Sequence, residues 1–168
     1  MGIESAHMAF DSDCFSKARV STRSCTPACT RLVATSAVEP PTEPAWITGF
    51  EHRIDTQNLG ARDLTVSPST AASAQAAGAE GADVVELHAP FSHQELILRQ
   101  ALRLNGSASV NPSGGALAAN PMFAAGLTRI GEAATRVWSG DAGKAVAHAT
   151  SGPCLQQNLV CVMEASHG

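Results

Sequence analysis

The stretch Asp83-Val84-Val85-Glu86-Leu87-His88-Ala89-Pro90-Phe91-Ser92-His93-Gln94-Glu95 decides the fold class of this chain. Its first part, residues 84–88, is a short and mostly apolar run that is typical of a buried strand. A turn containing a proline follows, and the spacing of Ser92 and Glu95 is that of a capping box, which predicts that a helix begins there. A buried strand followed directly by a helix indicates an α/β fold.

The same alternation continues on both sides of this stretch. Upstream, residues 46–50 favour a strand, and Ser67-Pro68 supplies an N-cap hydroxyl and a first-turn proline for a helix that ends at Gly78. Downstream, Gly114-Gly115 predicts a turn into a helix of small residues. A second helix is expected over roughly 122–138, and strands over 145–148 and 159–163. The order is strand-helix-strand-helix-helix-strand-strand, so helices should pack against one sheet.

The chain changes character near residue 39. Residues 1–38 carry three cysteines and no sustained period of a helix or a strand, apart from a short strand-like run at 31–35. The proline-rich segment 39–44 then breaks any helix. We therefore expect an irregular N-terminal segment over 1–38, poorly ordered or loosely packed over 1–30, and a folded domain over 39–168.

Composition excludes several classes of protein. The chain has 168 residues, a net charge of −4 and 15% charged residues, so one domain is expected and a nucleic-acid partner is not. No run approaches the ~18–20 apolar residues of a membrane span, and the first residues lack the apolar core of a secretory signal. The five cysteines are an odd and loosely spaced set. They predict neither a disulfide framework nor a metal site, and a cytoplasmic location is the simplest expectation.

Three places carry residues suited to chemistry. His88 lies where a strand ends, which is where α/β folds place ligands; it is a candidate base or hydrogen-bond donor, or a histidine satisfied by local backbone. The run from Asn111 to Gly115 ends in two glycines before a helix, which suits either an anion or thioester oxygen at a helix start or a structural turn. Cys154 lies in a loop between two strands and is either a proton carrier or an ordinary loop thiol.

Three stretches carry a resemblance to a known family: Asp83 to Phe91, Val110 to Leu117, and His148 to Glu164. Together they resemble the C-terminal domain of the thiolase superfamily, closest to its lipid-transfer or sterol-carrier type. The resemblance implies a thiolase-like α/β domain, with a mixed sheet of about four to five strands packed by helices. It also implies acetyl-CoA acetyltransferase chemistry in lipid metabolism, through a cysteine acyl-thioester. In full-length members the nucleophilic cysteine belongs to an N-terminal domain, and Cys14, Cys25 and Cys29 stand in no such context.

The resemblance assigns roles residue by residue. His88 matches the histidine of the family's H-D-x-F motif, here His88-Ala89-Pro90-Phe91. Asn120 aligns with the histidine of a G-H-P motif, and it donates hydrogen bonds without moving protons. Gly152 aligns with the acid/base cysteine of a C-x-G loop, and Cys154 stands two positions later. The implied catalytic residues are His88, Asn120 and Cys154; the implied substrate-binding residues are Asn111, Ser113, Gly114, Gly115 and Gly152.

Two functions follow from this resemblance. The first is the C-terminal half of a thiolase-like acyl-CoA acyltransferase, inactive without an N-terminal half that carries the nucleophile. The alternative is a non-catalytic module or scaffold that binds acyl-CoA or a lipid thioester. A third reading is a lyase-type subunit with a zinc-ribbon/OB-fold partner, but such relatives are thought to use tyrosines and this chain has none. We expect no cofactor other than coenzyme A thioester as substrate, and either a homo-oligomer or a pairing with an N-terminal half.

Overall fold

The computed structural model describes residues 44–165, except 105 and 122. The expectations for residues 1–38, including the strand at 31–35 and Cys14, Cys25 and Cys29, lie outside the described residues. Ten elements follow one another along the chain: β1 (Trp46–Ile54), η1 (Leu59–Ala61), α2 (Pro68–Ala77), β2 (Val84–Glu86), α3 (Ser92–Ala101), β3 (Ser109–Val110), α4 (Gly115–Ala118), α5 (Ala125–Trp138), β4 (Lys144–Ser151) and β5 (Gln157–Glu164).

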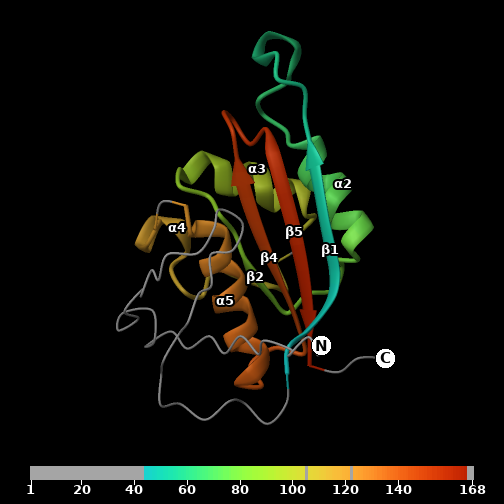
Figure 1. The fold of residues 1–168 in the computed structure, drawn as a ribbon, viewed down its shortest axis with the longest axis vertical. Coiled ribbons are helices and arrows are strands. Elements are labelled where there is room, and N and C mark those ends of the chain that lie inside the picture. The colour runs from blue at the N-terminus through green and yellow to red at the C-terminus, as the bar shows by residue number, and fades with distance from the viewer. Residues whose placement is uncertain (1–43, 105, 122, 166–168) are drawn as a thin grey trace, which may run out of the picture.

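These strands form one mixed sheet in the order β1-β5-β4-β2-β3 (Figure 1). Strands β4, β2 and β3 run parallel, whereas β5 runs antiparallel to both of its neighbours, β4 and β1. The predicted α/β class and mixed sheet are therefore confirmed. The carboxyl ends of β2, β3 and β4 meet at one edge, where an α/β sheet offers space for a ligand.

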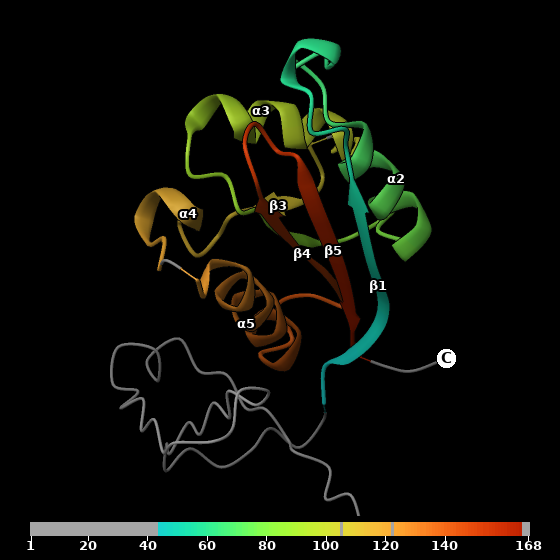
Figure 2. The ribbon, with the colours of Figure 1, turned by 45° about the horizontal axis from the view of Figure 1, so that its top comes forward.

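Helices cover both faces of the sheet, with α2 and α3 on one side and α5 on the other (Figure 2). The core beneath α2 and α3 is built from Val85, Leu87, Leu98, Val160 and Val162, among others. The core beneath α5 is built from small side chains, including Ala133, Ala145 and Ala147. Each core is a thin layer of closely packed residues, as the alanine-rich sequence requires.

Helix α2 approaches β1 very closely, and a glycine makes this possible. A Cβ atom added at Gly49 would overlap the carbonyl oxygen of Ala77 at the end of α2. The pairing of β1 with β5 is irregular between Ile47 and Gly49, which is the signature of a β-bulge. Gly78 then ends α2 in the left-handed conformation, as predicted from its position.

The structure corrects some local expectations. The predicted capping box is wrong: Phe91 is the N-cap residue of α3, and it makes no side-chain capping bond. Glu95 instead pairs with Arg99 at 2.8 Å and accepts a hydrogen bond from Asn111 Nδ2 at 3.2 Å. Strand β2 ends at Glu86 rather than residue 88, and the two-residue strand β3 is an addition to the predicted elements. In the described part of the chain, no helix is long and apolar enough to cross a membrane.

Candidate functional site

His88 stands two residues beyond the end of β2, at the carboxyl edge of the parallel strands. Its backbone N–H donates to the carbonyl of His148 on β4 at 3.2 Å, which extends the pairing of the two strands. Both ring nitrogens have partners: Nδ1 lies 3.1 Å from the carbonyl oxygen and 3.4 Å from the N–H of Thr150, and Nε2 lies 3.1 Å from Asn120 Oδ1. The structure thus brings together His88 and Asn120, two residues predicted for the site from segments 32 positions apart.

The protonation of His88 follows from its surroundings. Burial lowers the pKa of His88, while the hydrogen bonds to Asn120 and to the Thr150 carbonyl oppose that shift in part. The ring is therefore neutral near pH 7 and carries one N–H. In one tautomer Nε2 donates to Asn120 Oδ1 and Nδ1 accepts from the N–H of Thr150; in the other, Nδ1 donates to the Thr150 carbonyl and Nε2 is an acceptor for a ligand. Such a ring can take up a proton or, in its other tautomer, donate one.

Asn111 fixes the backbone next to His88. Asn111 adopts a left-handed conformation with φ of 52°, which asparagine tolerates better than most residues. Its Oδ1 accepts a hydrogen bond from the N–H of Leu87 at 2.6 Å, and its own N–H donates to the carbonyl of Val85 at 2.9 Å. Asn111 therefore holds the backbone at the end of β2 in place through these two hydrogen bonds.

Gly114 and Gly115 both adopt left-handed conformations in the turn before α4, with φ of 89° and 63°. A Cβ atom at Gly115 would lie 2.8 Å from the side chain of Asn111, so only glycine fits beside that side chain. The N–H groups of both glycines already donate within the turn, to the Asn111 carbonyl at 2.8 Å and to Ser113 Oγ at 3.2 Å. The glycines thus offer a ligand close approach to the backbone rather than free donors.

A buried ion pair lies directly beneath this turn. Glu86 and Arg129 are 0% and 2% exposed, and their charged groups are 3.0 Å apart. Ser113 completes the cluster: its Oγ donates to Glu86 Oε2 at 2.6 Å, its N–H donates to Glu86 Oε1 at 3.1 Å, and its Oγ accepts from Arg129 Nη1 at 3.0 Å. This cluster, which we call the Glu86 cluster, ties the glycine turn to β2 and α5.

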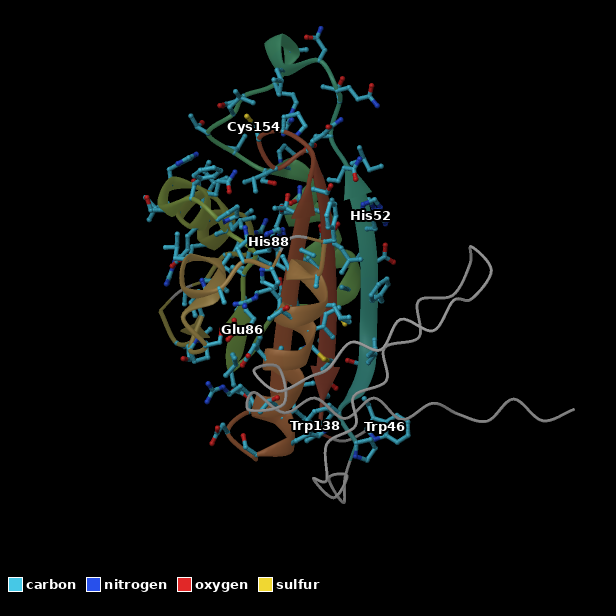
Figure 3. The ribbon with its side chains drawn as sticks, turned by 60° about the vertical axis from the view of Figure 1, so that its left-hand side comes forward. Trp46, His52, Glu86, His88, Trp138 and Cys154 are labelled. Carbon is cyan, nitrogen blue, oxygen red and sulfur yellow. The ribbon has the colours of Figure 1, made fainter. Side chains whose placement is uncertain are left out.

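Cys154 and Gly152 lie apart from this group, in the exposed loop between β4 and β5. Figure 3 shows Glu86 on β2, His88 beyond the end of that strand, and Cys154 farther out where the β4–β5 hairpin turns. Within residues 44–165, the side chain of His88 bonds to Thr150 and Asn120 and not to Cys154, so Thr150 on β4 links the loop to the histidine ring. Gly152, Cys154 and Leu155 are all left-handed, with φ of 72°, 53° and 56°.

Three large apolar side chains lie close to His88 or Asn120 in the sequence and are exposed in the structure. Phe91 follows His88 by three residues and is 59% exposed; Phe123 follows Asn120 by three residues and is fully exposed; Leu117 on α4 is 59% exposed. Large exposed apolar side chains mark interaction or ligand-binding surfaces where they form one patch. A hollow of about 440 Å³ lies elsewhere, between α2 and the end of α3, and none of these residues lines it.

A second polar network lies on the other face of the sheet. His148 is 0% exposed, and burial lowers its pKa to about 4, so the ring is neutral. Its Nε2 lies 2.9 Å from Asn158 Oδ1, and Asn158 Nδ2 donates to Ser69 Oγ at 2.7 Å and to the carbonyl of Leu155 at 2.8 Å. Because the amide group of Asn158 is already a donor, His148 Nε2 must carry the proton.

The sequence prediction missed Glu86, Arg129 and Thr150. A glutamate inside the apolar run 84–87 was a usable signal, because a charge buried in a strand requires a partner. The partner on α5 and the backbone carbonyl of Thr150 left no local signature. Among the described residues, no group of three His, Cys, Asp or Glu side chains is arranged to hold a metal ion.

Comparison with known proteins bears on the fold. No family model matches the chain, and no curated protein matches it. Among solved structures, human mitochondrial 3-ketoacyl-CoA thiolase matches at a TM-score of 0.59 and 21% identity, over 76% of this chain and 31% of that one. The same enzyme in complex with CoA matches over 77% and 32% at the same score and identity. The chain spans about a third of the length of these structures, and the part that matches has the thiolase fold.

Proposed function

We propose that this chain is the C-terminal half of a thiolase-like acyl-CoA acyltransferase of the lipid-transfer type, which needs a separate N-terminal half to supply the nucleophilic cysteine. The observation that carries the proposal is the hydrogen-bonded pair of His88 and Asn120, which stands beside the glycine turn at the carboxyl edge of the parallel strands. In open α/β sheets, ligands bind beyond the carboxyl ends of the strands, so a thioester would meet the sheet at this edge.

In this proposal His88 and Asn120 donate hydrogen bonds to the thioester carbonyl oxygen, where negative charge develops when a thiolate attacks the carbonyl carbon. Asn111 and Ser113 hold the turn from which Gly114 and Gly115 admit the ligand close to the backbone. Phe91, Leu117 and Phe123 offer apolar surface to the acyl group. Gly152 and Cys154 belong to the loop above the site, where the Cys154 thiol would exchange a proton with the substrate.

An uncovered strip on one face of the sheet supports the need for a second half. Phe50 pairs across β1 and β5 with Cys161, which belongs to the core beneath α5, so Phe50 points to the same face as that helix. Among the described elements of that face, α5 packs mainly against β4, β2 and β5 rather than against β1. Phe50 and Ile54 are 56% and 58% exposed on this strand. A partner element of apolar character would bury this strip, and the solved thiolases are about three times longer than the region they share with this chain.

A second candidate is a module that binds acyl-CoA without chemistry. It is favoured by Asn120, which cannot carry charge or move a proton at the position opposite His88. It is also favoured by the separation of Cys154 from His88, since a proton carrier must reach the reacting group. The two candidates differ in one respect: only the half-enzyme gains activity from an N-terminal half.

Calorimetric titration with acetyl-CoA and with a long-chain acyl-CoA tests binding, and a parallel thiolysis assay tests turnover. We expect binding without turnover by the chain alone. Turnover should appear when a thiolase N-terminal half carrying the nucleophile is added, and its absence despite complex formation would favour the binding module. Turnover by the chain alone would contradict both candidates, because a cysteine of this chain would then be the nucleophile.

Two variants locate the ligand. Gly115→Val should abolish binding, because its side chain would displace Asn111 and with it the backbone that carries His88. His88→Ala should weaken binding only modestly, by the loss of one hydrogen bond. A matched control is Gly140→Ala, since no atom lies within 4 Å of a Cβ at that left-handed glycine beyond α5. Equal affinities for all three variants would show that the thioester binds elsewhere.

A further inference from the structure

Arg62 reaches from the segment between β1 and α2 to the loop that carries Cys154. Its Nη1 donates to the carbonyl of Pro153 at 3.2 Å, and its Nη2 donates to the carbonyl of Cys154 at 2.6 Å. The Arg62 side chain is only 6% exposed, although it belongs to an otherwise exposed excursion. Two bonds from one planar guanidinium fix both the position and the orientation of the loop backbone.

The loop needs such fixing because its conformation is unfavourable. Cys154 and Leu155 are successive non-glycine residues in the left-handed region, and Gly152, two positions before Cys154, is in the same region. Left-handed non-glycine residues are sterically disfavoured and persist only where the surroundings impose them. No feature of the local sequence favours this conformation at Cys154 or Leu155.

Other contacts hold the loop at its far end. The carbonyl of Leu155 accepts from Asn158 Nδ2 at 2.8 Å, and the carbonyl of Gln156 accepts from the N–H of Asp55 at 2.8 Å. Asp55 Oδ2 lies 3.9 Å from Arg62 Nη2 and accepts a hydrogen bond from Ser69 Oγ at 2.6 Å. The Asp55 carboxylate therefore helps to orient the Arg62 guanidinium. Arg62 thus holds the side of the loop that bears Cys154 directly, and through the Asp55 carboxylate it also acts on the far end, where the Asp55 N–H meets Gln156.

We infer that Arg62 is a positioning residue: it holds the loop after β4 with Gly152, Cys154 and Leu155 in the left-handed conformation, and so sets where the Cys154 thiol lies relative to the ligand site. The effect on ligands rests on the proposed function, whereas the effect on the loop does not. Arg62 acts through the backbone of Pro153 and Cys154 and need not touch substrate. Its removal frees the loop to relax into ordinary backbone conformations, which changes where Gly152 and Cys154 lie relative to Thr150 and His88.

Amide hydrogen exchange, followed by NMR on the full chain, tests the loop directly. The Asp55 amide reports on loop opening because it donates to Gln156, and the Ser109 amide, which donates to the carbonyl of Asp83, reports on the remote edge of the sheet. In Arg62→Met we expect Asp55 to exchange about 10- to 100-fold faster, the range that corresponds to losing a hydrogen bond from a charged donor. Ser109 should be unchanged. In Arg62→Lys the exchange rate of Asp55 should lie between those of the unaltered chain and Arg62→Met, since lysine keeps the charge but cannot donate two hydrogen bonds from one planar group.

Titration with acetyl-CoA in the same variants tests the positioning role. Arg53→Met is the matched control because, among the described residues, the Arg53 side chain bonds to Glu51 and to the carbonyl of His52 on exposed β1. We expect at least a tenfold loss of affinity in Arg62→Met and none in Arg53→Met. Unchanged exchange at Asp55 would overturn the inference whatever the affinities. Faster exchange with unchanged affinity would overturn the positioning role. If the unaltered chain binds no acetyl-CoA, the proposed function fails while faster exchange at Asp55 still supports the hold of Arg62 on the loop.

Discussion

Replacing Arg129 with methionine isolates the energetic role of the Glu86 cluster. The substitution keeps an unbranched side chain in the core but removes the guanidinium that lies 3.0 Å from Glu86 Oε2. Glu86 is fully buried, so its carboxylate loses its countercharge without gaining water. Two donors from Ser113 remain, its N–H at 3.1 Å and its hydroxyl at 2.6 Å. They satisfy lone pairs but do not neutralise the charge.

The expected loss is large for a domain of this size. Breaking a buried ion pair by removing one partner costs about 3–5 kcal/mol. A whole domain is stable by only about 5–15 kcal/mol, so Arg129→Met should remove a fifth or more of the stability. Glu86→Gln added to Arg129→Met should restore part of the loss, because a neutral amide is less costly to bury than an unpaired carboxylate.

Urea unfolding, followed by circular dichroism, measures these differences as shifts in the midpoint. Arg53→Met is the control: its partner Glu51 is 33% exposed and Arg53 itself is 47% exposed, so its loss should cost at most about 1 kcal/mol. The reasoning is refuted if Arg129→Met costs no more than Arg53→Met. It is refuted as well if the double variant is no more stable than Arg129→Met alone.

Three further predictions concern stability. Gly49→Ala should destabilise the domain by about 3 kcal/mol or more and shift its thermal midpoint downwards, because the added methyl overlaps the Ala77 carbonyl on α2. Leu98→Ala should cost about 3–5 kcal/mol of unfolding free energy, since Leu98 is fully buried, whereas Leu96→Ala on the same helix, 70% exposed, should cost about 0.5 kcal/mol or less. Burial lowers the pKa of His148 from 6.5 to about 4, so the unfolded chain binds the extra proton in that interval. Stability should therefore fall by up to about 3 kcal/mol as the pH drops from about 6.5 to 4, and His148→Gln should flatten this dependence in urea titrations.

Much of the fold could be predicted because its signals are local. Pro68 and Gly78 mark the two ends of α2, and the apolar run at 84–87 marks β2. The exceptions have physical causes. Glu95 has the right spacing for a capping box, but its carboxylate is drawn to Arg99 and Asn111 instead. Strand β3 has only two residues, too few for any period to be detected.

The candidate site could likewise be predicted only in part. His88 and Asn120 were predicted one by one, and their hydrogen bond across 32 positions could not be derived from spacing alone. The Glu86 cluster draws on β2, the glycine turn and α5, so only the tertiary structure shows that the three meet. The hydrogen bond from Arg62 to the Cys154 carbonyl joins residues 92 positions apart. An arginine in a polar loop does not indicate in the sequence which carbonyl it will bind. Contacts between backbone carbonyls and distant side chains leave no sequence pattern.

The pairing of β1 with β5 joins the first and last strands of the described domain, and this has a consequence for synthesis. Residues 46–54 leave the ribosome about 5–20 s before residues 157–164, at ordinary rates of translation. During that interval Phe50 and Ile54 stand on a strand with no hydrogen-bonding neighbour, which is a template for association with other chains. Neither antiparallel pairing of the sheet can form until β5 is complete. The nascent domain is therefore most exposed to aggregation just before its last strand emerges, and a chain cut short before residue 157 would stay in that state.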